Sequence, residues 1–487
     1  MKSKFFFQSD ENHYLQDITN NYLLFLPLEL FKQIQMCLDT PNFEVEGHSS
    51  YYGRKARFLL ENLENERSIE QNYTSRLTPE LIENSLANAR QITFEVTERC
   101  NLNCKYCTYG ELYDDYLPRQ KKDLPLEYAE RLIEYLSRYW SSPGYTSVNR
   151  AFSIGFYGGE ALLKVDLIKK IIQFVNAKRT GNIDFTFAMT TNGILLDQYM
   201  DFLVENDIQL MISLDGDEQN NSYRVTESGE NYFHTILSNI RLLKERFPEY
   251  FKEKVGVASV LHNKNSVSEI YNFFRDQFDT EARITELNQT GIKSEKREKF
   301  DTMYRNRRES FYQAEDYDRI KDDMFFREPD TYMLMHYLDT YSGNYFKTFE
   351  GFFIDKESVK WLPTGTCIPF EKKVFLTAGG KILPCERIGH QFITGTVDEN
   401  GVNIDFNEIT NRYNQYYDNL KSHCLKCYQL KHCTKCVLFI ENIEDKPVCS
   451  DYFDEERFKQ YLSNNISFLS KNPALYKKIM SEVILDD

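Results

Sequence analysis

Between residues 91 and 288, the pattern of apolar and polar positions predicts strands and helices in turn. Short runs rich in β-branched and aromatic residues stand between longer stretches in which apolar residues recur every three or four positions. The expected strands are 91–97, 151–157, 183–190, 208–214, 254–261 and 283–288, and the expected helices are 125–140, 165–178, 196–205, 232–246 and 266–278. Six such repeats predict a parallel sheet, curved or partly closed, whose functional loops follow the carboxyl ends of its strands.

The residues before this region show a different pattern. Two strand-like runs, 4–8 and 13–18, are separated by a turn sequence, and Pro27 opens a helical pattern over 27–38. Further helical patterns follow at 54–63 and 79–90. A strand pair followed by helices predicts a small winged-helix-like unit, and a decorative N-terminal extension fits the pattern equally well. Residues 295–350 are charged and helical in pattern, the chain beyond Trp361 is expected to be loop-rich, and the last forty residues are again helical in pattern.

Composition narrows the possible classes of protein. A chain of 487 residues suggests two to four domains, and a formal net charge of −15 argues against a nucleic-acid partner. No apolar run is long enough to span a bilayer, and the N-terminus lacks the apolar segment of a signal peptide. We therefore expect a cytoplasmic protein without a membrane partner. In that compartment its eleven cysteines are expected to bind metal rather than form disulfides.

Three of the cysteines, Cys100, Cys104 and Cys107, follow the first expected strand with the spacing C-x3-C-x2-C. Three thiolates this close together can bind three irons of a [4Fe–4S] cluster and leave the fourth iron open. A structural zinc site would favour four ligands in C-x2-C pairs, which this spacing does not supply. The triplet therefore predicts a cluster whose open iron can bind and activate a ligand.

This triplet resembles the C-x3-C-x-aromatic-C motif of the radical SAM superfamily, with Tyr106 as the aromatic residue. The resemblance implies a partial (β/α)6 TIM-like barrel in which S-adenosylmethionine chelates the open iron. An electron supplied by a reductant such as flavodoxin or ferredoxin then cleaves the sulfonium and produces a 5′-deoxyadenosyl radical. This radical abstracts a hydrogen atom from an unactivated C–H bond, which protein side chains alone do not achieve.

Further residues match the cofactor-binding positions of that family. A Gly-Gly-Glu sequence ends the second expected strand, and in the family it binds the methionyl amine. By the same resemblance Ser213 contacts the ribose and Arg224 the methionyl carboxylate, although Arg224 also fits an ordinary surface arginine. The residues implied to bind the cofactor are Tyr106, Gly158, Gly159, Glu160, Asn192, Ser213 and Arg224.

A second group of cysteines follows near the C-terminus. It has the spacing C-x12-G-x4-C, then C-x2-C-x5-C-x2-C, then a last cysteine, and is formed by Cys367, Cys385, Cys424, Cys427, Cys433, Cys436 and Cys449. The group is similar to the SPASM extension of radical SAM enzymes, which holds two auxiliary [4Fe–4S] clusters, so that the chain would hold three. The family usually has x3 where this chain has x2 before Cys436, and in isolation a pair of zinc ribbons would also fit.

The resemblance also implies how these ligands are shared. One auxiliary cluster would take Cys424, Cys427, Cys433 and Cys449, and the other would take Cys367, Cys385 and Cys436. The remaining cysteine, Cys37, lies far away in the sequence. The second of these clusters would therefore have an open iron or a ligand other than cysteine, and an open iron could bind a substrate thiolate.

SPASM proteins act mostly on peptides, and the N-terminal unit resembles the peptide-recognition element of ribosomal-peptide maturases, which binds a leader peptide as an added strand. We therefore expect an enzyme that installs a thioether or C–C crosslink in a ribosomally made precursor peptide. An anaerobic sulfatase-maturing (formylglycine-generating) enzyme, a peptide epimerase and a non-catalytic zinc-binding scaffold remain alternatives. The sequence assigns no catalytic proton donor or acceptor. The expected domains are a leader-recognition element (1–88), the radical SAM core (89–295), a helical bridge (296–360), the SPASM domain (361–452) and a helical tail (453–487).

Overall fold

The computed structural model describes residues 4–18, 21–39, 50–62, 76–116, 119–140, 151–178, 183–341, 362, 364, 367–430 and 433–482. The chain forms two compact units. The first unit consists of residues 1–76, 321–366 and 414–487, and the second of residues 77–320 and 367–413. Every helix in the described part of the chain is too short or too polar to cross a membrane.

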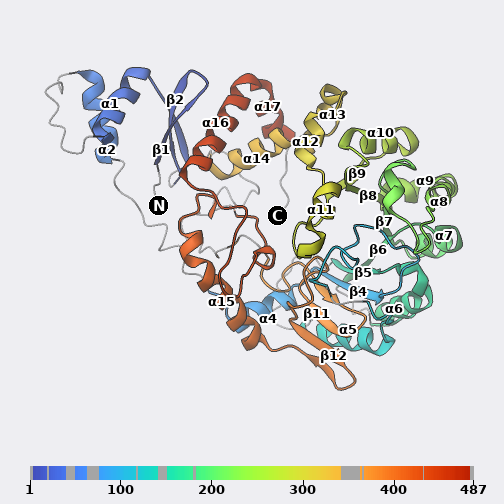
Figure 1. The fold of residues 1–487 in the computed structure, drawn as a ribbon. Helices are drawn as coiled ribbons and strands as arrows, with labels where there is room; N and C mark the ends of the chain where they lie inside the picture. The colour runs from blue at the N-terminus through green and yellow to red at the C-terminus, as the bar shows by residue number, and fades with distance from the viewer. Residues whose placement is uncertain are drawn as a thin grey trace. The chain divides into compact units, whose positions relative to one another are not determined.

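The second unit is built on a mostly parallel sheet. Six strands follow one another in both sequence and space, each parallel to the next (Figure 1). They are β4 (Gln91–Thr97), β5 (Ala151–Gly158), β6 (Asp184–Thr191), β7 (Gln209–Ser213), β8 (Val255–Leu261) and β9 (Ala282–Glu286). The six strands expected from the sequence are thus confirmed, with ends that differ by one or two residues.

Helices connect the parallel strands, as their sequence pattern predicted. They are α5 (Leu126–Tyr139), α6 (Val165–Ala177), α7 (Leu196–Glu205), α8 (Phe233–Arg246) and α10 (Val267–Phe278). Their apolar residues form one stripe; in α5 this stripe contains Ala129, Leu132, Ile133 and Leu136, all of them buried. Shorter helices of this unit are α4 (Pro79–Ala87), α9 (Pro248–Lys254), α11 (Arg297–Met303) and α12 (Arg307–Tyr312), and α13 (Tyr317–Asp323) follows them.

The sheet continues beyond β4 with strands from the cysteine-rich part of the chain. β10 (Val374–Leu376) lies parallel to β4, and β11 (Lys381–Leu383), β12 (Gly395–Asp398) and β13 (Gly401–Asn403) follow as antiparallel strands. The long helix α15 (Phe406–Cys424) comes next. Most described residues between 367 and 454 lie outside helices and strands, as expected, but these four strands and α15 were not predicted. Strands of three or four residues are too short to show alternation, and the buried stripe of α15 is made largely of tyrosines, so that its sequence looks polar.

The first unit contains a three-stranded antiparallel sheet of β1 (Lys4–Ser9), β2 (Asn12–Asp17) and β3 (Tyr22–Leu26). α1 (Leu28–Asp39) and α2 (Tyr51–Asn62) follow it. Leu15 and Leu26 of the sheet share a buried cluster with Leu30 and Ile34 of α1 and with Ala56 of α2. The strand pair and the first helices match their prediction. β3 was not predicted, because its sequence YLLFL is a continuous apolar run without alternation.

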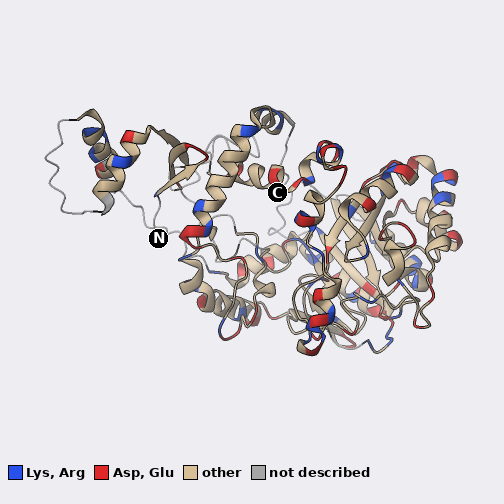
Figure 2. Ribbon diagram, turned by 45° about the horizontal axis from the view of Figure 1, so that its top comes forward, with Lys and Arg blue, Asp and Glu red and all other residues tan. Residues whose placement is uncertain are grey.

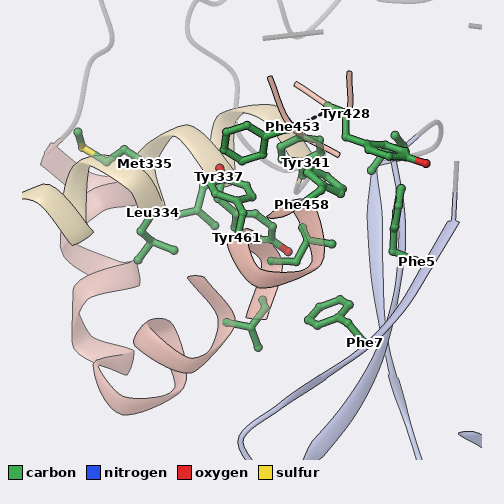
Figure 3. Packing of buried hydrophobic residues seen from close by; sticks show 14 of the residues in the cluster. Phe5, Phe7, Leu334, Met335, Tyr337, Tyr341, Tyr428, Phe453, Phe458 and Tyr461 are labelled. Carbon is green, nitrogen blue, oxygen red and sulfur yellow. Dashed lines mark hydrogen bonds between the residues drawn. The ribbon is translucent and has the colours of Figure 1, made fainter. Parts of the chain in front are cut away.

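Phe5 and Phe7 of β1 belong to a second cluster, which joins the sheet to helices from distant parts of the sequence. These helices are α14 (Pro329–Tyr341), α16 (Glu455–Lys471) and α17 (Pro473–Glu482). Figure 3 shows the rings of this core, in which Phe5 lies 4.8 Å from Tyr428 and 4.9 Å from Phe458 between ring centroids. Strands from the N-terminus and helices from the C-terminus thus share one core, which also contains Cys427.

Charged residues lie mainly outside the parallel sheet. Figure 2 shows basic and acidic residues side by side on the helices and loops, whereas the strands carry few of either sign. Several of these neighbours are ion pairs, such as Arg246 with Asp201 at 2.6 Å and Lys178 with Glu134 at 2.9 Å. Such exposed pairs contribute little to stability, about 0 to 1 kcal/mol each.

Candidate functional site

The C-x3-C-x2-C segment lies in the loop that follows β4, at the carboxyl edge of the parallel sheet. Its backbone is fixed to the loop that follows β7. Asn103 and Lys105 donate backbone N–H groups to the carbonyl oxygens of Val225 and Tyr223, at 2.6 and 3.0 Å. The predicted cluster loop is therefore attached to the segment that carries Arg224.

The three thiols of this loop lie near one another. Both Cys100 and Cys107 act electrostatically on Cys104, and desolvation by the surrounding chain, the largest contribution, raises the pKa of Cys104 to about 12. The thiol is therefore protonated near neutral pH, and binding to iron must release its proton. Among the described residues, no group of three or more His, Cys, Asp or Glu side chains could hold a single metal ion. A [4Fe–4S] cube binds one thiolate on each of its irons, so its ligands need not converge on one point.

The Gly-Gly pair at the end of β5 allows two backbone segments to touch. Gly158 has a φ of +141°, and a Cβ atom on Gly159 would overlap the carbonyl group of Arg99. Gly159 and Glu160 also donate backbone N–H groups to the carbonyl oxygens of Thr97 and Arg99, at 2.8 and 2.9 Å. The glycines thus position the end of β5 directly against the start of the cysteine loop.

Glu160 is fully buried and is held by the loop after β6. Its carboxylate accepts hydrogen bonds from Thr191 Oγ1 (2.6 Å) and from the backbone N–H groups of Asn192 (2.7 Å) and Leu162 (3.0 Å). Burial raises the pKa of Glu160, and these three hydrogen bonds oppose the shift. The side chain joins the ends of β5 and β6, and its predicted contact with a methionyl amine remains a prediction.

Asn192 connects the loop after β6 to the cysteines. Its Nδ2 donates to Asn101 Oδ1 at 2.7 Å and lies 3.9 Å from Cys100 Sγ. Its Oδ1 accepts from the backbone N–H of Ile194 at 3.1 Å, which fixes the orientation of the amide. Asn192, one of the predicted cofactor-binding residues, therefore lies beside Cys100, the first cysteine of the triplet.

Tyr106 and Arg224 meet at a buried carboxylate, Asp215, which the sequence did not assign. Arg224 Nη2 lies 3.1 Å from Asp215 Oδ1, and the hydroxyl of Tyr106 donates to the other oxygen. The guanidinium also lies over the Tyr106 ring, 5.6 Å from its centroid. Burial would raise the pKa of Asp215, but the charge of Arg224 and hydrogen bonds to Arg224 and His262 hold it at about 2. The carboxylate is therefore ionised and keeps Arg224 in place.

One hydrogen-bond donor of Arg224 has no acceptor among the described residues. Within the described structure, its Nε is buried and has no hydrogen-bond partner. A carboxylate is the group that this donor fits best, since guanidinium groups bind carboxylates through two N–H groups. Ser213, the last residue of β7, is half-buried at the same edge of the sheet. These donors fit the carboxylate and hydroxyl groups of S-adenosylmethionine.

The second cysteine group is divided between the two units. Cys367 and Cys385 belong to the second unit, and Cys424, Cys427, Cys433, Cys436 and Cys449 belong to the first. The thiols of Cys427, Cys433 and Cys449 lie near enough to act on one another, although burial is the main cause of the raised pKa of Cys427. Three of the four expected ligands of one auxiliary cluster thus lie together. The assignment of Cys367, Cys385 and Cys436 to one cluster remains a prediction.

A cavity of about 500 Å³ lies on one face of the parallel sheet. Small residues on neighbouring strands, Thr93, Gly155, Ala188 and Gly256, leave this space, and Tyr157 also lines it. The ion pair between Lys373 and Glu386, at 2.9 Å, lies in its wall. The sequence pattern gave no sign of this cavity, because which strand residues share a face follows from the register between strands.

Comparison with known proteins gives a consistent result for the core. Residues 94–276 match the model of the radical SAM superfamily. An uncharacterized protein of Methanocaldococcus jannaschii is 29% identical over 36% of this chain and 54% of its own length. A cysteine-type anaerobic sulfatase-maturating enzyme of Clostridium novyi is 27% identical over 37% of this chain and 46% of its own. The radical SAM cyclopropyl synthase TigE of Paramaledivibacter caminithermalis is 25% identical over 32% and 33%.

These curated relatives match this chain over about half of their own length or less. A solved structure, native anSMEcpe with bound AdoMet, has a TM-score of 0.51 and 16% identity and covers 81% of this chain and 100% of its own. That similarity extends the shared fold beyond the matched core. Together with the cysteine loop at the carboxyl edge of a parallel sheet, these matches show that residues 94–276 contain a domain of the radical SAM superfamily.

Proposed function

We propose that this chain is a radical SAM peptide maturase that installs a thioether or C–C crosslink in a ribosomally made precursor peptide. The observation that carries this proposal is the small sheet in the first unit. Within the described residues, β3 pairs with β2 alone, so its other edge can receive an extended peptide as a further strand. Phe25 on this strand is 60% exposed and offers an apolar contact to such a peptide.

In the proposed reaction, S-adenosylmethionine and the reduced cluster would supply the 5′-deoxyadenosyl radical. Cys100, Cys104 and Cys107 would hold the cluster. Arg224 would bind the methionyl carboxylate through its free Nε, and Asp215 would keep the guanidinium oriented. The other proposed contacts are Tyr106, Gly158, Gly159, Glu160, Asn192 and Ser213, with a flavodoxin or ferredoxin as reductant.

The second cysteine group would hold two auxiliary [4Fe–4S] clusters. Cys424, Cys427, Cys433 and Cys449 would bind one, and Cys367, Cys385 and Cys436 the other. The second would then have an open iron available to a substrate thiolate, which suits thioether formation. Each expected domain would have its own role. Residues 1–88 would recognise the leader, residues 89–295 would carry out the radical chemistry, and residues 361–452 would transfer electrons through the auxiliary clusters. Residues 296–360 and 453–487 would be helical segments that support these domains.

The test is anaerobic co-expression of the enzyme with the precursor peptide encoded beside it, followed by mass spectrometry of the peptide. A crosslink removes two hydrogens from the peptide. Epimerisation would leave the mass unchanged in water and introduce deuterium from heavy water. A peptide unchanged in both solvents would refute the proposal.

A sulfatase-maturing activity is the second candidate, because four of the matched relatives carry that name. Incubation with a C-x-P-x-R peptide and a search for formylglycine would reveal it. Metal analysis after anaerobic purification separates both enzymes from a zinc-binding scaffold. Three clusters correspond to about twelve irons per chain, whereas a scaffold would contain zinc and little iron.

A further inference from the structure

Glu95 lies on β4, the strand whose residues Gln91 and Thr93 line the cavity of the parallel sheet. Gln91 and Thr93 of the same strand line this cavity, and alternate residues of a strand point to the same face. Glu95 is therefore directed to that face, at the carboxyl end of the strand. Its register partner on β5 is Tyr157, which also lines the cavity. The carboxyl group is 1% exposed and stands five residues before the first cysteine of the triplet.

One oxygen of this carboxyl group lacks a donor. Oε2 accepts the backbone N–H of Ala378 at 3.0 Å, whereas Oε1 is buried and has no hydrogen-bond partner among the described residues. Beside it, Arg119 Nε is also buried and, in the described structure, has no partner, and the hydroxyl of Tyr109 faces the carboxyl group. An unpartnered acceptor, Glu95 Oε1, and an unpartnered donor, Arg119 Nε, in one buried place indicate a site that can receive a polar group or a proton.

The charged groups around Glu95 do not keep its carboxyl group ionised at all pH values near neutrality. Burial, the largest contribution, raises the pKa of Glu95 to about 7, against the lowering effects of the Ala378 N–H group and of Arg119. Glu98 and Tyr109 also face it, and Tyr157 lies near it on β5. The guanidinium of Arg119 lies 4.1 Å from the ring centroid of Tyr109 and donates to the carbonyl oxygen of Glu98 at 2.8 Å. Its positive charge therefore interacts with these two groups as well as with Glu95.

Other carboxylates near this edge of the sheet are already occupied. Asp215 is paired with Arg224, and Glu160 accepts three protein hydrogen bonds. Glu386 accepts two hydrogen bonds from Lys373, at 2.9 Å each. Glu98 accepts the backbone N–H groups of Gln120 and Lys122 at 2.6 and 3.1 Å. Glu95 differs from these four because one of its oxygens is buried and has no hydrogen-bond partner among the described residues.

We propose that Glu95 accepts the proton that the peptide releases when the crosslink forms. The inference rests on the proposed function. The 5′-deoxyadenosyl radical removes one hydrogen atom from a peptide C–H group, and the carbon radical then bonds to a second peptide group that bears a hydrogen. Bond formation leaves one proton and one electron to be removed. The proton passes to Glu95, and the electron passes to an oxidised iron–sulfur cluster of the enzyme.

The test compares wild-type enzyme with Glu95→Gln, Glu95→Asp and a control, Glu245→Gln on an exposed part of α8. Each is incubated anaerobically with the precursor peptide across a range of pH, and 5′-deoxyadenosine and crosslinked peptide are measured separately. Glutamine keeps the acceptor for the Ala378 N–H group but cannot take a proton. We expect Glu95→Gln to form 5′-deoxyadenosine at the wild-type rate and crosslinked peptide about 100-fold more slowly. Glu95→Asp should recover part of the loss, and Glu245→Gln should match wild type.

The pH profile separates a proton acceptor from a structural residue. In wild type, crosslinking should decline as the pH falls through about 7, because Glu95 becomes protonated, and Glu95→Gln should lack this limb. Crosslinking by Glu95→Gln at the wild-type rate and with the wild-type profile would overturn the inference. Equal loss of 5′-deoxyadenosine and product would also overturn it, since Glu95 would then serve the cofactor site or the fold.

A measurement without peptide distinguishes this inference from the proposed function. Infrared difference spectra of the holoenzyme should show a protonated carboxyl band that disappears between about pH 6 and pH 8 and is missing in Glu95→Gln. A wild-type enzyme that shows this band and leaves the precursor unchanged would contradict the proposed function and, with it, the role of Glu95. An enzyme that crosslinks the precursor and shows no band titrating in this range would contradict the inference alone.

Discussion

At the scale of single residues, the site depends on buried charges that hold one another. Asp215 is fully buried, and it also accepts the backbone N–H of Val260 at 2.9 Å. Through Arg224 and Tyr106 it connects β7, the loop after β7 and the cysteine loop. Replacing both partners of a buried ion pair by apolar residues can leave the stability of a protein unchanged. Removing only one partner lowers the stability, because the other charge stays buried without a counter-charge. Asp215 should therefore matter for stability as well as for cofactor binding.

We predict that Asp215→Asn lowers the free energy of unfolding by about 3 to 5 kcal/mol at pH 7, because Arg224 loses its counter-charge. Anaerobic urea denaturation measures this difference. The matched control is Asp201→Asn, whose partner Arg246 is exposed and whose loss should cost less than about 1 kcal/mol. Equal effects of the two substitutions would show that the buried pair has no special role.

Glu95 should make the stability of the protein depend on pH. Its folded-state pKa of about 7 lies above the ordinary 4.5. Its stabilising contribution is therefore complete below about pH 4.5 and is lost as the pH rises through 7. Glu95→Gln has no charge to bury, so it should be more stable than wild type at pH 8, by up to about 3 kcal/mol, and similar at pH 4.5. Denaturation of both proteins at the two pH values tests this; a difference that does not change with pH would contradict it.

At the scale of elements, the end of β5 and the start of the cysteine loop are in backbone contact. We predict that Gly159→Ala separates them, since the added Cβ would overlap the carbonyl of Arg99. The variant should retain less iron at the triplet and form 5′-deoxyadenosine at least about tenfold more slowly, a change of about 1.4 kcal/mol in barrier.

The control for this prediction is Gly379→Ala, in a turn where the nearest atom to an added Cβ is 4.0 Å away. Its iron content and its rate of 5′-deoxyadenosine formation should equal those of wild type. Gly159→Ala with unchanged iron content and rate would show that the loop can move without loss of the cluster.

The sequence predicted the regular elements of this fold better than the irregular ones. The parallel strands and their helices have long periodic patterns, and the spacing of the cysteines indicates a cluster-binding motif. β3 and β10 to β13 were missed because they are short or lack alternation. Asp215 was not assigned from the sequence, because its bond to Tyr106, 109 positions away, arises only when two strand ends meet. The unpartnered oxygen of Glu95 likewise depends on which described residues of neighbouring segments face it, which the sequence alone does not show.

At the scale of the whole molecule, the first unit is assembled from three separate stretches of the chain. We predict that Phe458→Ala, which removes a fully buried ring from the core around Phe5, Tyr341 and Tyr428, lowers the stability of this unit by about 3 to 5 kcal/mol. Because Cys427 lies in the same core, iron bound by the second cysteine group should fall as well. Denaturation and iron analysis measure the two effects.

Phe326→Ala is the matched control for this substitution, because Phe326 is 48% exposed and should tolerate the change. Loss of stability without loss of iron in Phe458→Ala would show that the cysteines fold independently of the N-terminal sheet.

The proposed function requires that the radical made at the cysteine triplet reacts with a peptide. The most direct measurement uses a precursor peptide deuterated at carbon, in one anaerobic turnover with S-adenosylmethionine and a reductant, followed by mass spectrometry of the nucleoside. Transfer of one deuterium into 5′-deoxyadenosine, in step with the loss of one deuterium and one further hydrogen from the peptide, is the predicted result. Unlabelled 5′-deoxyadenosine beside an unchanged peptide would contradict the account.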